Sequence, residues 1–364
     1  MEEQLYQKLA PYGITRRDFL KYCGSLAAML GLSELYIPQI AAAVEKAAAR
    51  PPVIWLSMSS CTGDTEQIAK SFNPTPAELV LDILSIDYWE TLMAPAGEKA
   101  EKSLRDSIKE NKGKYIVCVE GAIPKGDDGV YLTIGEKTGL EVTKEVCADA
   151  AAVIAVGSCA SFGGIPAAEP NPTSAVGVGD IIGKDKVVNI STCPANYSWV
   201  VGTIVSYVLL GELPELDDLN RPKPFFGQTI HENCTRRGHF EAGEFVEEFG
   251  SEEAAKEYCL YKVGCKGPET YAACPITLWN NKVNWCVGAG APCIGCSEPQ
   301  FWDKNTPLYD RMPGVTLPGI GNVSADTIGA VLGIATAAGL GVHLVGQVVT
   351  GRLGKGGPEE GGGE

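Results

Sequence analysis

The sequence predicts an α/β fold in which a parallel sheet is followed by a second unit organised around metal. Four short apolar runs predict the strands of the sheet, at residues 53–56, 115–119, 152–156 and 187–190. Runs that are apolar throughout suit parallel strands covered by helices on both faces. Longer helical stretches separate these runs, for example over residues 76–84 and 199–210. The second unit is predicted because cysteine and histidine become frequent beyond residue 221.

The composition limits the possible functions. The 364 residues are 45% hydrophobic and 21% charged, which is enough for a substantial core and two folded units. The formal net charge is -15 and no basic stripe is visible, which argues against nucleic acid as the main partner. The 13 cysteines are compatible with disulfides, metal ligands or buried thiols.

The amino-terminal segment has the features of an export signal. A paired arginine, Arg16-Arg17, precedes an apolar run over 22–32 and small residues near 41–49. This pattern predicts a twin-arginine signal peptide over residues 1–45. The alternative is an amphipathic helix with two surface arginines. A cysteine-rich exported chain is usually a disulfide scaffold. Twin-arginine export carries folded proteins, however, so metal sites assembled before export stay possible.

Three cysteines follow predicted strands. Cys61, Cys159 and Cys193 each lie in a turn-rich loop directly after an apolar run. The carboxyl ends of parallel strands meet at one edge of a sheet, where open α/β folds bind their ligands. The sequence therefore predicts that these three thiols converge on one site.

The segment over residues 221–310 holds two further groups of potential ligands. They lie at close spacing on glycine- and proline-rich loops, and they are His231, Cys234, Cys259 and Cys265, then Cys274, Cys286, Cys293 and Cys296. Donors on short loops converge on metal with little loss of loop entropy. Zinc is one possible occupant, since four such donors make ordinary zinc sites. Backbone amides in these loops can point at cluster sulfurs, which favours iron–sulfur clusters.

The carboxyl-terminal tail contains a long uncharged run. Residues 327–351 carry no formal charge, which is long enough to span a bilayer. Arg352 and Lys355 follow it, as expected for a segment that ends on the cytoplasmic side. We therefore predict a hydrophobic helix over 325–351 that anchors the protein in a membrane. The alternative is a soluble, glycine- and alanine-rich helix packed on a partner.

From Pro52 to about Asp310 the chain resembles the small, iron–sulfur subunit of nickel–iron hydrogenases, of the periplasmic or membrane-associated uptake type. The resemblance is carried by Cys61-Thr-Gly, Gly157-Ser-Cys159-x3-Gly163-Gly164, Cys193-Pro194, His231-x2-Cys234, Gly264-Cys265-Lys-Gly-Pro-Glu-Thr-Tyr271 and Pro292-Cys293-x2-Cys296-Ser-Glu. It implies a flavodoxin-like, doubly wound domain over 50–220, followed by an irregular iron–sulfur domain over 221–310.

The resemblance also implies three iron–sulfur clusters and their ligands. The proximal four-iron cluster falls on Cys61, Asp64, Cys159 and Cys193. The distal four-iron cluster falls on His231, Cys234, Cys259 and Cys265. The medial cluster falls on Cys274, Cys286, Cys293 and Cys296. No catalytic residue is expected in this chain, because the family's nickel–iron centre belongs to the large subunit, an obligate partner.

The sequence departs from the family pattern at two positions. The family usually has cysteine where this chain has Asp64, so the carboxylate either ligates iron, as in one branch of the family, or caps a helix near Thr65. Many relatives have proline where this chain has Cys286 and carry a three-iron medial cluster. A fourth thiolate predicts a four-iron medial cluster instead, with a three-iron cluster or a buried free thiol as the alternatives.

The resemblance implies electron transfer in series. Electrons from hydrogen oxidation at the large-subunit site would pass through the proximal, medial and distal clusters to a cytochrome or a quinone-reducing membrane partner. The expected location is the periplasmic side of the cell membrane. A hydrogen-sensing relative and an exported binding protein with zinc or disulfides are the alternatives. Cys118 and Cys147 are expected to be buried thiols, and Glu66 and Glu120 either relay protons or cap loops.

Overall fold

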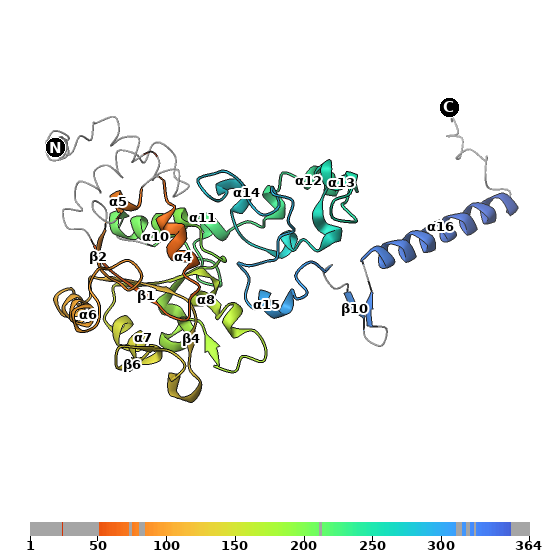
Figure 1. The fold of residues 1–364 in the computed structure, drawn as a ribbon. Helices are drawn as coiled ribbons and strands as arrows, with labels where there is room; N and C mark the ends of the chain where they lie inside the picture. Colours follow the sequence, from red (N-terminus) through yellow and green to blue (C-terminus); the bar gives the residue numbers. More distant parts are fainter. Residues whose placement is uncertain are drawn as a thin grey trace, which may run out of the picture. The chain divides into compact units, whose positions relative to one another are not determined.

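The computed structural model describes residue 24 and residues 51–72, 75–79, 84–210, 213–310, 315–317, 321–323 and 325–350 (Figure 1). The predicted signal peptide over 1–45 lies outside the described residues apart from residue 24, and so do Arg352 and Lys355. The chain divides into two compact units, Met1–Arg311 and Met312–Glu364.

The first unit is built on a five-stranded sheet with the spatial order β2-β1-β3-β7-β9. Its strands are β1 Pro52–Ser57, β2 Ser85–Trp89, β3 Ile116–Glu120, β7 Ala152–Val156 and β9 Val187–Ile190. Every neighbouring pair is parallel. This is the order 2-1-3-4-5 of flavodoxin-like doubly wound folds. The predicted α/β class is therefore confirmed.

Four of the five strands coincide with the apolar runs that predict them. The sequence pattern does not predict β2. Residues of β2, which carries Asp87, are only half-buried over its first three positions at one edge of the sheet, whereas β9 at the other edge is buried throughout. Two further pairs of short antiparallel strands lie outside the main sheet: β4 Ile123–Pro124 with β8 Ala175–Val176, and β5 Thr133–Ile134 with β6 Lys137–Thr138.

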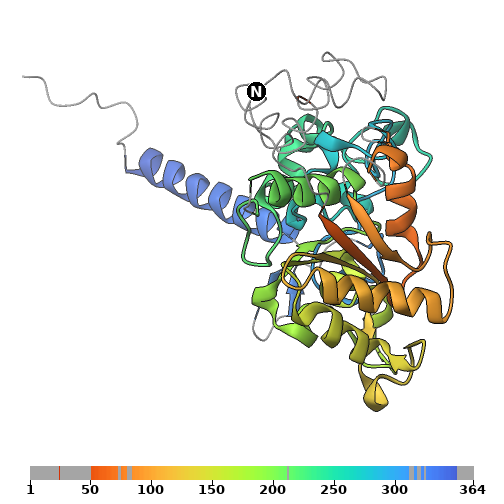
Figure 2. The same cartoon turned by 90° about the vertical axis from the view of Figure 1, so that its left-hand side faces the viewer.

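Helices cover both faces of the sheet (Figures 1 and 2). Successive side chains of a strand point to opposite faces, so β1 sends Val53 and Trp55 into one core and Ile54 and Leu56 into the other. The helices of the domain are α4 Gly63–Ala69, α5 Pro76–Glu78, α6 Glu98–Glu110, α7 Gly139–Ala148, α8 Gly157–Phe162, α9 Gly179–Ile182 and α10 Tyr197–Leu210, with 3-10 turns η4 Gly126–Gly129, η5 Ile165–Ala167 and η6 Lys184–Lys186.

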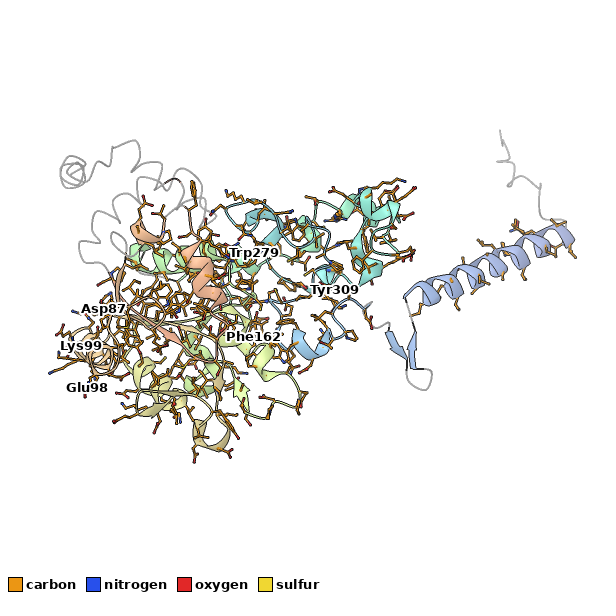
Figure 3. All side chains as sticks on the ribbon, viewed as in Figure 1. Asp87, Glu98, Lys99, Phe162, Trp279 and Tyr309 are labelled. Carbon is orange, nitrogen blue, oxygen red and sulfur yellow. The ribbon has the colours of Figure 1, made fainter. Side chains whose placement is uncertain are left out.

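A capping box begins α7, and contacts with the sheet hold α6 in place. Thr138 and Glu141 make a reciprocal capping box at the start of α7, which satisfies two otherwise unpaired amides. On α6, Leu104 is buried against the sheet, and Ser107 Oγ donates a hydrogen bond to Asp87 Oδ2 of β2 at 2.6 Å. Figure 3 shows Asp87 on the side of the sheet where Glu98 and Lys99 begin α6.

Two expectations about connecting segments need correction. The sequence predicts a turn-rich loop over 157–164, but this segment contains the helix α8, which ends at Gly163. The expected helix over 76–84 is present only as α5, and residues 80–83 lie outside the described residues. The predicted helix over 199–210 is confirmed, since α10 covers Tyr197–Leu210.

Beyond residue 221 the chain forms short helices joined by irregular loops. They are α11 Lys223–Phe226, α12 Arg237–Glu241, α13 Glu252–Ala255, α14 Cys274–Thr277 and α15 Phe301–Lys304, with 3-10 turns η7 His231–Asn233, η8 Leu260–Val263 and η9 Gly267–Glu269. Phe225 and Phe226 pack on Trp199 of α10, with ring centroids 5.8 and 5.2 Å away. The segment is thereby joined to the core of the sheet domain, and a domain boundary near residue 220 stays a prediction.

The second unit contains a hairpin and one long helix. The strands β10 Val315–Leu317 and β11 Gly321–Val323 pair antiparallel, and α16 covers Ala325–Val349. Residues Ile328–Val349 of α16 are apolar and long enough to cross a bilayer, with a mean hydropathy of 1.9. A helix is thus present where the hydrophobic helix is predicted, and its role as a membrane anchor stays a prediction.

Candidate metal centres

The first group of potential ligands lies at the carboxyl edge of the sheet. Cys61 follows β1, Cys159 lies in α8 directly after β7, Cys193 follows β9, and Asp64 is in the first turn of α4. We call these four residues the strand-end set. In this strand order the topological switch point lies between β1 and β3, where doubly wound folds bind ligands. The fold therefore explains why the loop with Cys61 and Asp64 belongs to a site.

The members of the strand-end set are within electrostatic range of one another. Burial raises the pKa of Cys159 to about 12, and Cys193, Asp64 and Cys61 raise it further. Burial likewise raises the pKa of Cys193 to about 11, together with Asp64 and Cys61. Cys61 and Cys193 are exposed, whereas Cys159 is half-buried. The ionised forms of these donors therefore repel one another, and the set is accessible from the surface at Cys61 and Cys193.

Glycines let the backbone approach these donors. Gly164 has a φ of +60°, and a Cβ added there would lie 2.5 Å from Cys159 Sγ. Gly157 has a φ of +85°, and its Cβ would lie 2.2 Å from Asp64 Oδ2. Both positions require glycine for their conformation and for the space that the donor side chains fill.

Asp64 is a buried acid in an unfavourable environment. Only 8% of it is exposed, and burial raises its pKa to about 8, with the charge of Glu120 adding to the rise. Its carboxylate accepts a hydrogen bond from the amide of Ala195, so the bond runs to the β9 loop rather than to α4. A buried carboxylate beside three thiols fits a site that holds a cation.

Glu120 fixes the backbone on which Asp64 sits. Its side chain is fully buried, and its Oε1 accepts the amides of Asp64 and Thr65 at 3.1 and 3.2 Å. Its Oε2 accepts hydrogen bonds from Trp55 Nε1 at 3.1 Å and from Thr65 Oγ1. This supports the loop-capping interpretation of Glu120. Glu66 instead is exposed and pairs with Lys70, which makes it a surface residue.

The second group surrounds a small cavity. The cavity is lined by His231, Cys234, Cys259 and Cys265, together with the charged Arg236 and with apolar and glycine residues, most of them in η8 and η9. We call these four residues the histidine set. Burial raises the pKa of Cys259 to about 11, with Cys265 and Cys234 adding to it. Burial, helped by Arg237, lowers the pKa of His231 and so favours the neutral imidazole that can bind metal.

The third group comprises Cys274, Cys286, Cys293 and Cys296, which we call the four-cysteine set. Burial raises the pKa of Cys274, and the charges of Cys293 and Cys286 raise it further. The pKa of Cys296 is raised by burial first, then by Cys274, and also by Cys286. Cys286, the residue that departs from the family pattern, therefore lies with the other three thiols.

The three sets are linked to one another through backbone amides. The amide of Cys293, in the four-cysteine set, donates to Cys265 Sγ of the histidine set at 3.4 Å. The amide of Cys193, in the strand-end set, donates a hydrogen bond to the sulfur of Cys296. This bond stabilises the thiolate and so lowers the pKa of Cys296, against the larger effect of burial. The four-cysteine set therefore lies between the other two.

The other cysteines of the described ranges behave as structural thiols. Cys118 is fully buried within β3 and Cys147 lies buried in α7, where burial raises the pKa of each thiol to about 12. All twelve cysteines in the part of the chain that the structure describes are free, so none of them forms a disulfide. Within these ranges, no three His, Cys, Asp or Glu side chains lie close enough to hold a single metal ion, whereas an iron–sulfur cluster binds its ligands at separate irons and takes donors that are farther apart.

Besides Arg236, which is 6% exposed and lines the cavity of the histidine set, two buried cations near the sets could not be recognised from the sequence pattern. Lys266 is 4% exposed and lies between the histidine set and the four-cysteine set. Arg221 is 3% exposed and pairs with Asp217 at 2.8 Å and Glu298 at 3.0 Å, two residues beyond Cys296. In the sequence both look like ordinary surface cations, because only the neighbours in space reveal their burial.

Known proteins resemble the chain over nearly its whole length. The family described as the C-terminal part of the NiFe/NiFeSe hydrogenase small subunit matches residues 226–309, and NADH ubiquinone oxidoreductase, 20 Kd subunit, matches residues 61–207. The quinone-reactive Ni/Fe-hydrogenase small chain of Wolinella succinogenes is 46% identical over 92% of this chain and 96% of its own length.

Two further relatives agree. The periplasmic [NiFe] hydrogenase small subunit 1 of Nitratidesulfovibrio vulgaris is 45% identical over 85% of this chain and 97% of its own length. A solved [NiFeSe]-hydrogenase structure from Dm. baculatum superimposes with a TM-score of 0.68 at 39% identity, covering 72% of this chain and all of that chain. The fold and the cysteine-rich sites thus define an iron–sulfur type of electron-transfer protein. The chain belongs to the family of nickel–iron hydrogenase small subunits.

Proposed function

We propose that this chain is the electron-transfer subunit of an exported nickel–iron hydrogenase. Electrons from hydrogen oxidation at the nickel–iron site of a large subunit pass through three iron–sulfur clusters to a cytochrome or quinone-linked acceptor. The observation that carries the proposal is the order of the donor sets, in which the four-cysteine set bonds to the strand-end set on one side and to the histidine set on the other.

The donors suit iron–sulfur clusters. Thiolates are the usual ligands of such clusters, and the strand-end, four-cysteine and histidine sets would hold the proximal, medial and distal clusters respectively. Each cluster, when bound, takes up and releases one electron. Burial raises the pKa of Cys159 and of Cys259, so these thiols release protons when they bind iron and the binding of iron depends on pH. The exposed Cys61 and Cys193 leave the strand-end set accessible to a partner subunit.

Iron and acid-labile sulfide analysis of the anaerobically purified heterodimer tests this proposal. Three four-iron clusters predict about twelve irons and as many sulfides per small subunit. A colourless protein that contains zinc and no labile sulfide would establish the competing zinc-binding function instead.

We propose that Asp64 is the fourth ligand of the proximal cluster. Its burial, its raised pKa and its place beside three thiols support this role. Asp64→Cys is expected to retain full iron with a shifted electron paramagnetic resonance (EPR) signal, whereas Asp64→Ala leaves one iron without a protein ligand. An Asp64→Ala protein with the wild-type proximal signal and potential would exclude ligation.

We propose that Cys286 makes the medial cluster a four-iron cluster. Its electrostatic interaction with Cys274 and Cys296 supports this, because a fourth thiolate is then available. Cys286→Ser is expected to give a three-iron signal in oxidised protein. A full-intensity three-iron signal in the unaltered protein would contradict the assignment.

We propose that the chain is exported by the twin-arginine route and is anchored on the periplasmic side of the cell membrane by α16. The apolar Ile328–Val349 stretch supports the anchor. Truncation before residue 325 should release the heterodimer into the soluble periplasmic fraction, and replacement of Arg16-Arg17 by two lysines should retain it in the cytoplasm. A truncated protein that stays in the membrane fraction would refute the anchor.

A further inference from the structure

The link between the histidine set and the four-cysteine set runs through two consecutive residues. The amide of Cys293 donates to Cys265 Sγ at 3.4 Å, and the amide of Lys266 donates to the carbonyl of Cys293 at 2.8 Å. Both backbone polar groups of Cys293 are therefore held by the Cys265–Lys266 pair. This arrangement fixes one donor loop against the other.

The side chain of Lys266 places a buried positive charge at this link. Its Nζ donates to the carbonyl of Gly264 at 2.9 Å and to the carbonyl of Asp310. Both acceptors are uncharged oxygens, so neither hydrogen bond neutralises the ammonium charge, although the carboxylates of Asp310 and Glu269 offset part of it. The groups that interact with it electrostatically are Cys265 first, then Asp310, Cys293 and Glu269. The charge therefore acts on a thiol from each of the two sets.

The lysine is held in place by the fold around it. Gly264 has a φ of +98°, and a Cβ there would lie 2.3 Å from the backbone of Tyr309. The backbone of Gly264 therefore packs directly on the segment of Tyr309 and Asp310, and these two segments supply the carbonyls that bind Lys266. The carbonyl of Lys266 accepts a hydrogen bond from Thr270 Oγ1 at 2.7 Å. A side chain fixed at both its backbone and its tip loses little further entropy and holds its charge in one position.

The link between the four-cysteine set and the strand-end set is made by other side chains. The segment with Cys296 is held against the strand-end loops by hydroxyl groups, since Ser158 Oγ donates to the carbonyl of Cys296 and Ser191 Oγ donates to that of Ser297 at 2.8 Å. This link also contains a buried cation, since Arg221 donates to the carbonyl of Ser297 at 3.1 Å. Two carboxylates, of Asp217 and Glu298, pair with Arg221, whereas the Lys266 ammonium bonds to carbonyl oxygens.

We propose that Lys266 is a positioning residue that raises the reduction potentials of the medial and distal clusters by stabilising the electron that each receives. This inference rests on the proposed function. Reduction adds one negative charge to a cluster, and a buried cation stabilises that charge more strongly than one in water would. With the clusters bound, Lys266 would favour electrons on the medial and distal clusters over their return to the proximal cluster.

Redox-poised EPR of the heterodimer carrying Lys266→Met tests the proposal. The medial and distal midpoint potentials are expected to fall, with a tenfold change in the ratio of reduced to oxidised cluster for each 59 mV, and the proximal potential should stay unchanged. Lys266→Gln removes the charge but keeps a hydrogen-bond donor, so it should behave like Lys266→Met. Lys266→Arg keeps the charge and should stay near wild type.

Lys262→Met is the matched control. Lys262 is four residues upstream, is 28% exposed at its side chain and pairs with Glu247, so water and the carboxylate already screen its charge. Unchanged potentials in both uncharged Lys266 variants with full iron content would overturn the proposal. Loss of the two clusters in both uncharged variants, with retention in Lys266→Arg, would also overturn it in favour of a purely structural role. An unaltered protein without three clusters would instead refute the proposed function.

Discussion

Replacement of Gly164 by alanine should disrupt the strand-end set without removing any donor. Gly164 has a φ of +60° and a ψ of -154°, a combination that is nearly exclusive to glycine. A Cβ at this position would lie 2.5 Å from Cys159 Sγ, 2.7 Å from its Cα and 2.9 Å from its amide nitrogen. The obstacle is largely backbone, so it cannot rotate away as a flexible side chain could.

The expected loss of stability has two parts. Holding alanine in this backbone conformation costs about 1–3 kcal/mol. Forcing a methyl group into a filled space costs a further amount of about 1–3 kcal/mol. The sum of about 2–6 kcal/mol is a large share of the stability of an ordinary domain, which is about 5–15 kcal/mol. We expect the structure to relieve it by moving Cys159 away from the other three donors.

Gly97→Ala separates the two parts. Gly97 has a φ of 56° and a ψ of -136°, close to the values of Gly164, but a Cβ there would meet nothing within 4 Å. This variant should carry the backbone strain alone and keep its full iron content. Gly164→Ala should lose about one third of its iron, as one of three four-iron clusters is lost.

The assay is iron and labile sulfide per heterodimer, combined with the apparent melting temperature at one scan rate. Full iron in Gly164→Ala, with a proximal signal identical to that of the unaltered protein, would refute the geometry of the strand-end set. An equal loss of iron in the Gly97 variant would show that general destabilisation, rather than displacement of Cys159, is responsible.

Three other changes test the packing around the sites. Arg221→Met leaves the carboxylates of Asp217 and Glu298 unpaired, which should destabilise the protein by about 3 kcal/mol and is contradicted by an unchanged melting temperature. Burial raises the pKa of Glu90 from 4.5 to about 7, so the folded state holds a proton that the unfolded state releases. Stability should therefore fall as pH rises from 4.5 to 7, by at most about 3 kcal/mol, and Glu90→Gln should remove that slope in a series of melting curves. Thr138→Ala removes the capping box of α7 and should cost about 1 kcal/mol, seen as faster hydrogen exchange in α7 but not in α6.

The parallel sheet could be predicted from the sequence because four of its strands are buried on both faces and therefore mainly apolar, although β3 ends in Glu120 and β9 contains Asn189. The edge strand β2 escaped this test, since Ser85 and Asp87 interrupt its apolar pattern. The helix α8 was also missed, because a run of six residues ending at Gly163 carries the signals of a turn. Edge position and short length are settled by tertiary contacts, which a local pattern does not contain.

The convergence of Cys61, Cys159 and Cys193 could be predicted from the sequence because each follows a strand of one parallel sheet. The sorting of the other eight donors into two sets depended on the family resemblance. Spacing alone does not separate the two sets, because Cys265 and Cys274 lie close together along the chain and fall in different sets. The burial of Lys266 and Arg221 could not be predicted, because it depends on distant segments, at Cys293 and Glu298.

Redox-poised EPR of the anaerobically purified heterodimer tests the central claim most directly. Three donor sets in series predict three one-electron signals that titrate separately, each lost when a ligand of its own set is replaced. A preparation that yields a single titrating signal, or one whose three signals all vanish together on replacing Cys274, would contradict the assignment of the sets.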